Sequence, residues 1–215
     1  MRLISFAATV AFATAALAAP ASLTVNVEGI ARNDAPIPAK YALCQATEDG
    51  KSKGGENYRP TIRWSGAPAG TKSYAVVVKD PDVPADFTDA GKEGKVVKED
   101  AKRQLFYHWA LADIPASIQE IPGSKSYEAP NFGVKASGSL AKYVDDPTQY
   151  GGPCPPWNDE RIHHYHFTVY ALDVASLKLP AEVTAAQVEK ALENHVIGSG
   201  NVVGTYTLNR ALKAN

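Results

Sequence analysis

The chain has 215 residues, a formal net charge of −1 and 45% hydrophobic residues. This charge balance argues against binding to nucleic acid or to an acidic membrane surface, and the length suits one domain with a full hydrophobic core. Its 16 glycines and 15 prolines stand between short β-type runs, which favours a mainly β fold over a helical bundle.

The first eighteen residues have the pattern of a secretory signal peptide. A positive start at Met1-Arg2 precedes a mostly apolar run, and Ala16-Leu17-Ala18 supplies small residues for cleavage. The alternative, a membrane anchor, is disfavoured because the run is shorter than the roughly 20 residues that span a bilayer. We therefore expect residues 1–18 to be removed and residues 19–215 to form a single exported domain, periplasmic or secreted, with no stable membrane insertion.

Short strands alternate with turn-forming segments through the first half of the chain. Strands are predicted at 23–27, 40–44, 61–64 and 73–78. The last of these is continuously apolar, as in a strand covered on both faces, and it ends at Asp80-Pro81-Asp82. Residues 48–60 are predicted to form a loop. Residues 85–102 are predicted to form a surface insertion, in which a short helix is the alternative.

The second half continues this pattern and adds one helix. Strands are predicted at 105–112, 163–172 and 201–208, with turns or loops at 116–122 and 127–150. The helix is predicted at 183–196, where Thr184 and Gln187 can form a capping box and Gly198 can end it. Its buried stripe is expected to consist of Val188, Leu192 and Val196.

Two predicted strands carry histidines toward the interior. Alternation places His163 and Tyr165 on one face of the strand 163–172, with His164 and His166 on the other. In the strand 105–112, alternation places His108 on the same face as Phe106 and Ala110, opposite Trp109. Buried polar side chains need partners, so these histidines are candidate site residues.

An acidic turn and a rigid loop complete the candidate site. An aspartate beside two imidazoles raises their basicity, so Asp80 would make His108 and His163 hydrogen-bond donors to an anion, helped by the Tyr165 hydroxyl. Residues 151–156, Gly-Gly-Pro-Cys-Pro-Pro, are conformationally restricted by proline, and such a loop can form a pocket wall with little entropy left to lose.

The two cysteines, Cys44 and Cys154, form a candidate disulfide in an exported protein. Two buried free thiols are the alternative, because a sequence does not show whether their Cα atoms lie within bonding distance.

Taken together, these segments resemble the phosphatidylethanolamine-binding protein family, in its bacterial Raf-kinase-inhibitor-like (YbhB/YbcL-type) branch. The resemblance spans most of the chain after Trp64, and the segments that carry it are Trp64-Ser65-Gly66-Ala67-Pro68-Ala69-Gly70-Thr71, Asp80-Pro81-Asp82-Val83-Pro84, His108-Trp109 with the later Ile114-Pro115, the 151–156 loop and the run from His163 to Asp173. It implies a PEBP-like β-sandwich of antiparallel sheets, with one C-terminal helix, short peripheral helices and a small anion pocket near one end.

The resemblance also implies which residues form that pocket. The ligand-binding positions of the family fall on Asp80, His108, Gly152, Pro153, Pro155, His163 and Tyr165, and we expect Asp82 and Trp109 to support them from behind. Three features depart from the family pattern: His164 stands where relatives often have arginine, residues 157–161 differ from the usual loop, and the insertion 85–104 is long.

The expected function is binding of a phosphate-type head group or another small anion, without catalysis and without a cofactor or metal. Regulation of an unidentified protein partner, as an inhibitor of a kinase or peptidase, is the main alternative. A hydrolase using Asp80 and His108 is less favoured because no serine lies in a nucleophile elbow. A metal site at His163, His164 and His166 is less favoured because His164 projects opposite to His163.

Overall fold

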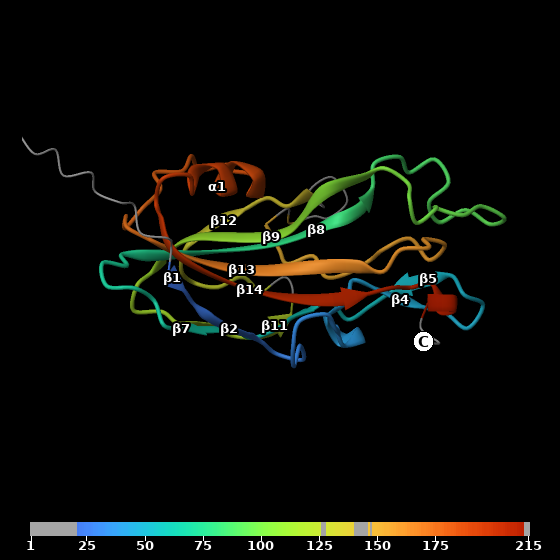
Figure 1. The fold of residues 1–215 in the computed structure, drawn as a ribbon, viewed down its shortest axis with the longest axis horizontal. Coiled ribbons are helices and arrows are strands. Elements are labelled where there is room, and N and C mark those ends of the chain that lie inside the picture. Colours follow the sequence, from blue (N-terminus) through green and yellow to red (C-terminus); the bar gives the residue numbers. More distant parts are fainter. Residues whose placement is uncertain (1–20, 126–127, 140–145, 147, 213–215) are drawn as a thin grey trace, which may run out of the picture.

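The computed structural model describes residues 21–125, 128–139, 146 and 148–212. The predicted signal peptide, residues 1–18, lies outside them. A seven-stranded sheet forms the centre of the molecule (Figure 1), with most strands in the order β1-β14-β13-β8-β9-β12 and β3 also paired with β14. The strands of this sheet are β1 (Ala21–Ser22), β3 (Ala35–Pro36), β8 (Ser73–Pro84), β9 (Arg103–Pro115), β12 (Val134–Ala136), β13 (His163–Leu172) and β14 (Val196–Tyr206). β1 and β3 pair with β14 in parallel, and the other pairs are antiparallel.

Three smaller antiparallel sheets lie below or beside the central one. The largest has the order β10-β7-β2, and the other two are the pairs β11-β6 and β4-β5. Their strands are β2 (Thr24–Val27), β4 (Cys44–Ala46), β5 (Ser52–Gly54), β6 (Tyr58–Arg59), β7 (Ile62–Ser65), β10 (Glu120–Ile121) and β11 (Ser124–Lys125). The helical elements are η1 (Ala39–Tyr41), α1 (Ala185–Ala191) and η3 (Arg210–Leu212). The fold is therefore a mainly β sandwich, as predicted.

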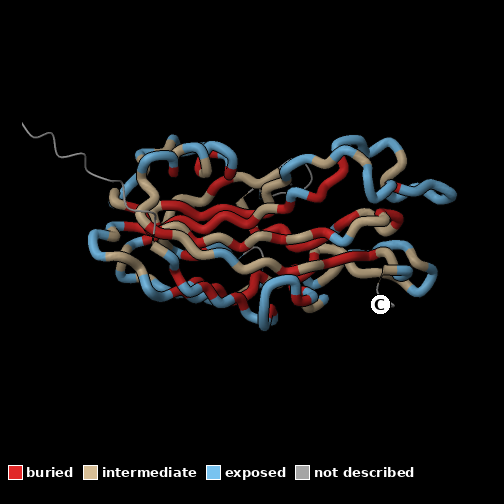
Figure 2. The backbone as a smooth tube through the Cα atoms, viewed as in Figure 1, coloured by how far each residue is buried: buried red, intermediate tan, exposed pale blue. Residues whose placement is uncertain are grey.

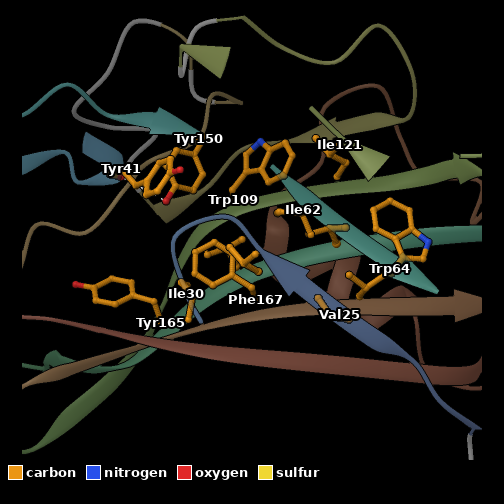
Figure 3. Packing of buried hydrophobic residues seen from close by; sticks show 14 of the residues in the cluster. Val25, Ile30, Tyr41, Ile62, Trp64, Trp109, Ile121, Tyr150, Tyr165 and Phe167 are labelled. Carbon is orange, nitrogen blue, oxygen red and sulfur yellow. Dashed lines mark hydrogen bonds between the residues drawn. The ribbon is translucent and has the colours of Figure 1, made fainter. Parts of the chain in front are cut away.

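Two hydrophobic clusters cover the two faces of the central sheet. One lies between this sheet and the β10-β7-β2 sheet, and its large members include Trp64, Trp109 and Phe167 (Figure 3). The other lies between the sheet and α1, with Val188 and Leu192 from the helix side. Burial follows this layering, since the buried segments run along the central strands and the exposed ones form the loops at both ends (Figure 2).

Six of the seven predicted strands are present, and three of them, β8, β9 and β14, are longer than predicted. The strand at 163–172 has the predicted bounds, with alternate residues buried from His163 to Ala171. The strand predicted at 73–78 continues to Pro84. The strand predicted at 40–44 is wrong, because residues 39–41 form a 3₁₀ turn and β4 begins only at Cys44. Short strands also interrupt the predicted loop at 48–60.

The helix is shorter than predicted, although its N-terminus has the predicted signal. Thr184 and Gln187 form the capping box, with hydrogen bonds between each side chain and the other residue's backbone N–H. The helix ends at Ala191, and Val196 and Gly198 belong to β14 instead. Gly198 therefore does not end the helix. It lies in close packing, because a Cβ there would be 2.8 Å from the Leu23 side chain and 3.0 Å from the Ala21 carbonyl oxygen.

Simple alternation fails in β9 because of a β-bulge. Val78 pairs with Trp109, but the next residue, Lys79, pairs with Tyr107. β9 therefore has one extra residue, His108, opposite β8. Such a bulge changes which face the following side chains occupy, and bulges often lie beside functional sites.

The bulge places His108 and Trp109 on the same face of the sheet. The His108 ring lies 5.0 Å from that of Tyr165, and Trp109 belongs to the cluster between the sheets. Ala110 packs in the cluster beside the helix. The prediction that His108 shares a face with Ala110 and opposes Trp109 is therefore wrong. The predicted neighbourhood of His108 and Phe106 is present, with 5.1 Å between the rings.

The 85–102 segment connects β8 to β9 at one end of the molecule, beyond the ends of the strands (Figure 1). We call it the arm. It is built from turns and contains no helix, so the short helix considered for it is absent. No helix among the described residues is both long enough and apolar enough to cross a membrane.

Candidate functional site

The Asp80-Pro81-Asp82 segment forms a second irregularity, in β8 itself. The pairing with β9 shifts between Asp80 and Val83, and the N–H of Asp82 donates to Oδ1 of Asp80 at 2.7 Å. Proline cannot donate to the ladder, so Pro81 is tolerated at this bulge and is exposed. As a result, the two aspartates are buried but contact different neighbours.

Asp80 forms a buried hydrogen bond with His163. Oδ2 of Asp80 lies 2.7 Å from Nδ1 of His163, and Nε2 of the same imidazole lies 3.2 Å from Oδ2 of Asp159. Both ring nitrogens therefore face carboxylates. Burial alone would lower the pKa of His163, but its hydrogen bonds to Asp159 and Asp80 outweigh burial and raise the pKa to about 9. His163 is thus an imidazolium near neutral pH.

Arg103 neutralises the second carboxylate. Its two terminal nitrogens donate to the two oxygens of Asp159 at 2.6 and 3.0 Å, a bidentate pair that is nearly inaccessible to solvent. Burial acts to raise the pKa of Asp159, but the hydrogen bonds from His163 and Arg103 lower it below its ordinary value. Asp80, His163, Asp159 and Arg103 therefore form a continuous network of alternating charge.

Asp82 supports the site from the outer side of β13. Its Oδ2 accepts from the backbone N–H of His164 at 3.0 Å and lies 2.8 Å from Nδ1 of the same residue. Its Oδ1 accepts from Arg161 at 3.3 Å. His164 and His166 point away from His163, and no group of three or more His, Cys, Asp or Glu side chains in the described part of the chain is arranged to hold a metal ion.

His108 differs from His163 in having one unused nitrogen. Its Nδ1 lies 2.8 Å from the carbonyl oxygen of Gly151, so Nδ1 carries the proton and donates. Its Nε2 is buried, has no hydrogen-bond partner among the described residues, and lies 4.0 Å from Oδ2 of Asp80. Burial lowers the pKa of His108 below the ordinary value, more than the nearby Asp80 raises it. His108 is therefore neutral near pH 7 and its Nε2 is a hydrogen-bond acceptor.

Tyr165 lies between the two histidines. Its ring centroid is 5.0 Å from that of His108 and 6.4 Å from that of His163. The hydroxyl points away from the apolar side chains drawn around it (Figure 3). Burial raises the pKa of Tyr165 well above its usual value, and the negative charge of Asp80 raises it further, so the phenol keeps its proton.

The 151–156 loop is held against His108 by several bonds. The N–H of Gly151 donates to the His108 carbonyl at 3.1 Å, and that of Gly152 donates to Oδ1 of Asn57 at 2.8 Å. Only glycine fits at position 152, because a Cβ would lie 2.0 Å from the Tyr41 carbonyl oxygen. The carbonyl of Pro153 accepts from Cys44, so Pro153 anchors the loop and does not line the cavity.

Cys44 and Cys154 form a disulfide across a sequence separation of 110 residues. It joins β4 to the 151–156 loop, and the Pro156 carbonyl beyond it accepts from the Asp159 N–H at 3.1 Å. Pro155 and Pro156 have no N–H to donate. The disulfide therefore links the residue before Pro155 covalently to β4.

A cavity of about 540 Å³ lies where these elements meet. Its polar end is formed by Asp80, His108, His163 and Tyr165, and its walls include Gly152, Cys154 and Pro155. Trp109 lies behind His108 in the core, where its ring contacts Tyr150 and the Arg59 guanidinium. The cavity thus brings together most of the residues singled out from the sequence.

Sequence reasoning did not identify three polar residues that hold this site. Asp159 and Arg103 complete the charge network, and Asn158 fixes the arm. In the sequence, Asp159 and Asn158 look like ordinary loop residues, and Arg103 looks like one more charge of a polar insertion. Asp159 contacts His163 only four residues away, but its pairing with Arg103 and the contacts of Asn158 with the arm join segments more than 50 residues apart, for which no local pattern is a signal.

Comparisons with known proteins give a consistent result. The family model described as phosphatidylethanolamine-binding protein matches residues 29–207. A UPF0098 protein from Pyrococcus abyssi is 32% identical over 186 residues, covering 85% of this chain and 84% of the relative. UPF0098 protein YbcL from Escherichia coli is 30% identical over 156 residues, covering 72% of this chain and 74% of the relative.

Solved structures show the same relationship. The crystal structure of E. coli YbcL, described as a new member of the mammalian PEBP family, superposes with a TM-score of 0.65 at 25% identity. It covers 87% of this chain and 99% of its own. A PEBP homologue from Chlamydia trachomatis superposes with a TM-score of 0.62 at 25% identity, covering 86% of this chain and 97% of its own.

Proposed function

The chain belongs to the phosphatidylethanolamine-binding protein family, and from this membership we propose that it is a non-catalytic binding protein for small phosphate-type or carboxylate ligands. Family membership implies a binding-protein fold. The observation that carries the proposal is the unused, buried Nε2 of His108 at the polar end of the cavity. An unpartnered polar atom in such a position costs free energy that a ligand can recover.

The charges around the cavity determine how an anion would bind there. The carboxylates of Asp80 and Asp159 are balanced by the imidazolium of His163 and the guanidinium of Arg103. Both nitrogens of His163 are occupied, so this residue positions Asp80 rather than donating to the ligand. The polar end therefore offers one unpartnered acceptor, Nε2 of His108, and one donor, the Tyr165 phenol, which also interacts with Asp80 and would turn from it to a ligand oxygen.

An anion fits these groups when it binds together with a proton. A phosphate monoester has a second pKa near 6, so its singly charged form keeps one P–OH group near neutral pH. That hydroxyl would donate to Nε2 of His108, and a phosphate oxygen would accept from Tyr165. A carboxylic acid would use its O–H and C=O in the same way. Gly152, Pro153 and Pro155 would keep the loop closed over the ligand.

Titration calorimetry with phosphate, phosphoethanolamine and acetate tests the proposal. We expect tighter binding at pH 5.5 than at pH 8, and uptake of a proton that shows as a dependence of the heat on the ionisation enthalpy of the buffer. His108→Ala should lose most of the affinity. His195→Ala is the matched control, because His195 is half-exposed and bonded to Asp173 away from the cavity. No binding at millimolar concentration, or equal binding by His108→Ala, would overturn the proposal.

We also propose export, supported by the sequence of residues 1–18, and it is tested by N-terminal sequencing of the protein from the exported fraction. Regulation of a partner enzyme remains the alternative function. Capture of a specific kinase or peptidase, with inhibition abolished by excess phosphate, would favour it. Turnover of esterase or phosphatase substrates that His108→Ala removes would contradict the non-catalytic proposal.

A further inference from the structure

Most of the large exposed apolar side chains of the described chain lie on the arm or near it. Four large hydrophobic residues of the described chain are exposed, and three of them, Phe87 at 51%, Val96 at 45% and Leu105 at 44%, lie on the arm or directly after it. Phe87 and Leu105 also line the cavity. Apolar groups gathered beside a pocket indicate a binding surface rather than the scattered exposure that is normal for a protein.

The arm is fixed to the cavity by a buried asparagine. The Asn158 side chain donates to the carbonyls of Asp89, Lys92 and Lys95 at 2.9, 3.3 and 2.9 Å. Its Oδ1 accepts from the N–H of Gly91 at 2.8 Å. The two N–H groups of this amide are shared among the three carbonyls, so one side chain contacts four backbone groups of the arm.

Two further ties join the arm to the charge network. Val97 is hydrogen-bonded through its backbone to Asn158 and Glu160, at 3.1 and 2.9 Å. Arg103, which pairs with Asp159, also donates to the carbonyl of Lys98 at 2.7 Å. The arm that carries Phe87 is therefore pre-organised by the network that orients Asp80, and it does not need to order when a ligand binds.

The cavity is too large for an inorganic anion alone. Its volume of about 540 Å³ falls within the range of roughly 300–1,000 Å³ for sites that hold one small organic molecule. Besides the polar group of Asp80, His108, His163 and Tyr165, the lining includes three neutral polar residues, Ser52, Gln104 and Ser139. The rest of the lining is mostly apolar, and we refer to its large side chains as the apolar end: Leu43, Val83, Phe87, Leu105, Pro155 and Trp157.

We infer that the ligand of this cavity is a soluble organic anion with a compact apolar body, such as an alkyl or aryl carboxylate or phosphate monoester. This inference rests on the proposed function and specifies its ligand class. The acidic group would lie between His108 and Tyr165, and the apolar body would lie against Phe87, Leu105 and Trp157. Phe87 and Leu105, which the long insertion positions, would then determine specificity.

A series of carboxylates of increasing size tests whether the apolar body binds beside Phe87 and Leu105. Calorimetry with acetate, butyrate, hexanoate and phenylacetate at pH 5.5 should show affinity rising about fourfold per buried methylene until the apolar end is filled. The readout is the ratio of hexanoate to acetate affinity. In the Phe87→Ser/Leu105→Ser variant that ratio should fall to near one. Val96→Ser is the matched control, since Val96 is equally exposed on the same arm but does not line the cavity, and it should retain the wild-type ratio.

The outcomes separate this inference from the proposed function. If acetate and phosphate bind but affinity does not rise with chain length, the inference is wrong and the proposed function stands. If the ratio is unchanged in Phe87→Ser/Leu105→Ser, the apolar body binds elsewhere and the inference is also wrong. If neither acetate nor phosphate binds, the proposed function is wrong, and the inference that rests on it is wrong as well. Sedimentation with phosphatidylethanolamine vesicles tests a membrane source, and vesicle binding that hexanoate does not displace would overturn the soluble ligand.

Discussion

His163 and Asp159 are four residues apart and share a buried hydrogen bond of 3.2 Å between Nε2 and Oδ2. This contact closes the turn before β13 and, together with the Asp80 bond on the other ring nitrogen, fixes His163 in its charged form. A residue that the sequence suggests as a ligand donor is therefore used to hold two carboxylates in place. Its charge has consequences that can be measured.

Stability should fall as the pH rises through the pKa of His163. This pKa is about 9 in the folded protein, compared with 6.5 for an unperturbed histidine. Because the folded value is raised, the stabilisation is fully present below pH 6.5 and is lost between about pH 6.5 and 9. The difference corresponds to on the order of 3 kcal/mol. Urea unfolding at pH 6 to 9.5 would measure it, and His163→Gln should remove this alkaline decline. A midpoint in the wild-type protein that stays constant to pH 9.5 would contradict the assignment.

Removing the charge at position 159 should lower the pKa of His163. In Asp159→Asn the imidazole loses one of its two carboxylates, and we expect its pKa to fall from about 9 into the range of about 6–8. The Cε1–H resonance of His163, followed by NMR across this pH range, gives the value. Asp173→Asn is the control, because Asp173 contacts His195 and should leave the titration of His163 unchanged.

Much of the fold follows from local patterns, and the site does so only in part. Strand 163–172 has strict alternation, so its bounds and its buried face could be predicted. The helix start could be predicted from its capping box, but its end could not, since residues 196–206 gain more from pairing with β13 and the other strands. Sheet pairing is a long-range effect that overrides a helical pattern.

The geometry of the site also depends on long-range contacts that a local sequence pattern does not contain. Motifs identify His108 as a site residue, but its orientation depends on a bulge whose position is set by pairing between two strands. Asp159 and Arg103 meet across 56 residues of chain, and neither stands in a motif. The cavity's apolar end depends on where the arm folds back. A sequence alone does not contain these contacts in a local form.

Gly152→Ala should disrupt the pocket loop. A Cβ at this position would lie 2.0 Å from the Tyr41 carbonyl and 3.0 Å from the Leu43 amide nitrogen, both backbone atoms that cannot move aside easily. We expect a loss of about 1–3 kcal/mol in the free energy of unfolding, together with weaker phosphate binding. Gly54→Ala is the matched control. No atom lies within 4 Å of its Cβ position, so its stability should stay within about 0.5 kcal/mol of wild type.

The disulfide should contribute to both stability and binding. Cross-linking residues separated by 110 positions lowers the entropy of the unfolded chain, and the chain-entropy model gives at most about 4–5 kcal/mol for a closed loop of this size. In Cys44→Ser/Cys154→Ser the Pro155 wall also loses its covalent tie, so phosphate affinity should fall. Urea unfolding and calorimetry with and without reductant measure the two effects. Reductant should change the wild-type protein and leave the double variant unaffected.

Asn158→Ala should release the arm without unfolding the sandwich. The substitution removes two N–H donors, shared among three carbonyls, and one acceptor, so the arm loses about three hydrogen bonds, each worth about 0.5–1.5 kcal/mol, while the strands that hold the charge network keep their pairing. Since 1.4 kcal/mol corresponds to a factor of 10, trypsin cleavage after Lys92 and Lys95 should accelerate by about tenfold or more. Asn26→Ala, at an exposed position of β2, is the control and should be cleaved at the wild-type rate. Equal cleavage of both variants would show that Asn158 does not hold the arm, whereas fast cleavage with an unchanged thermal midpoint would separate arm opening from global unfolding.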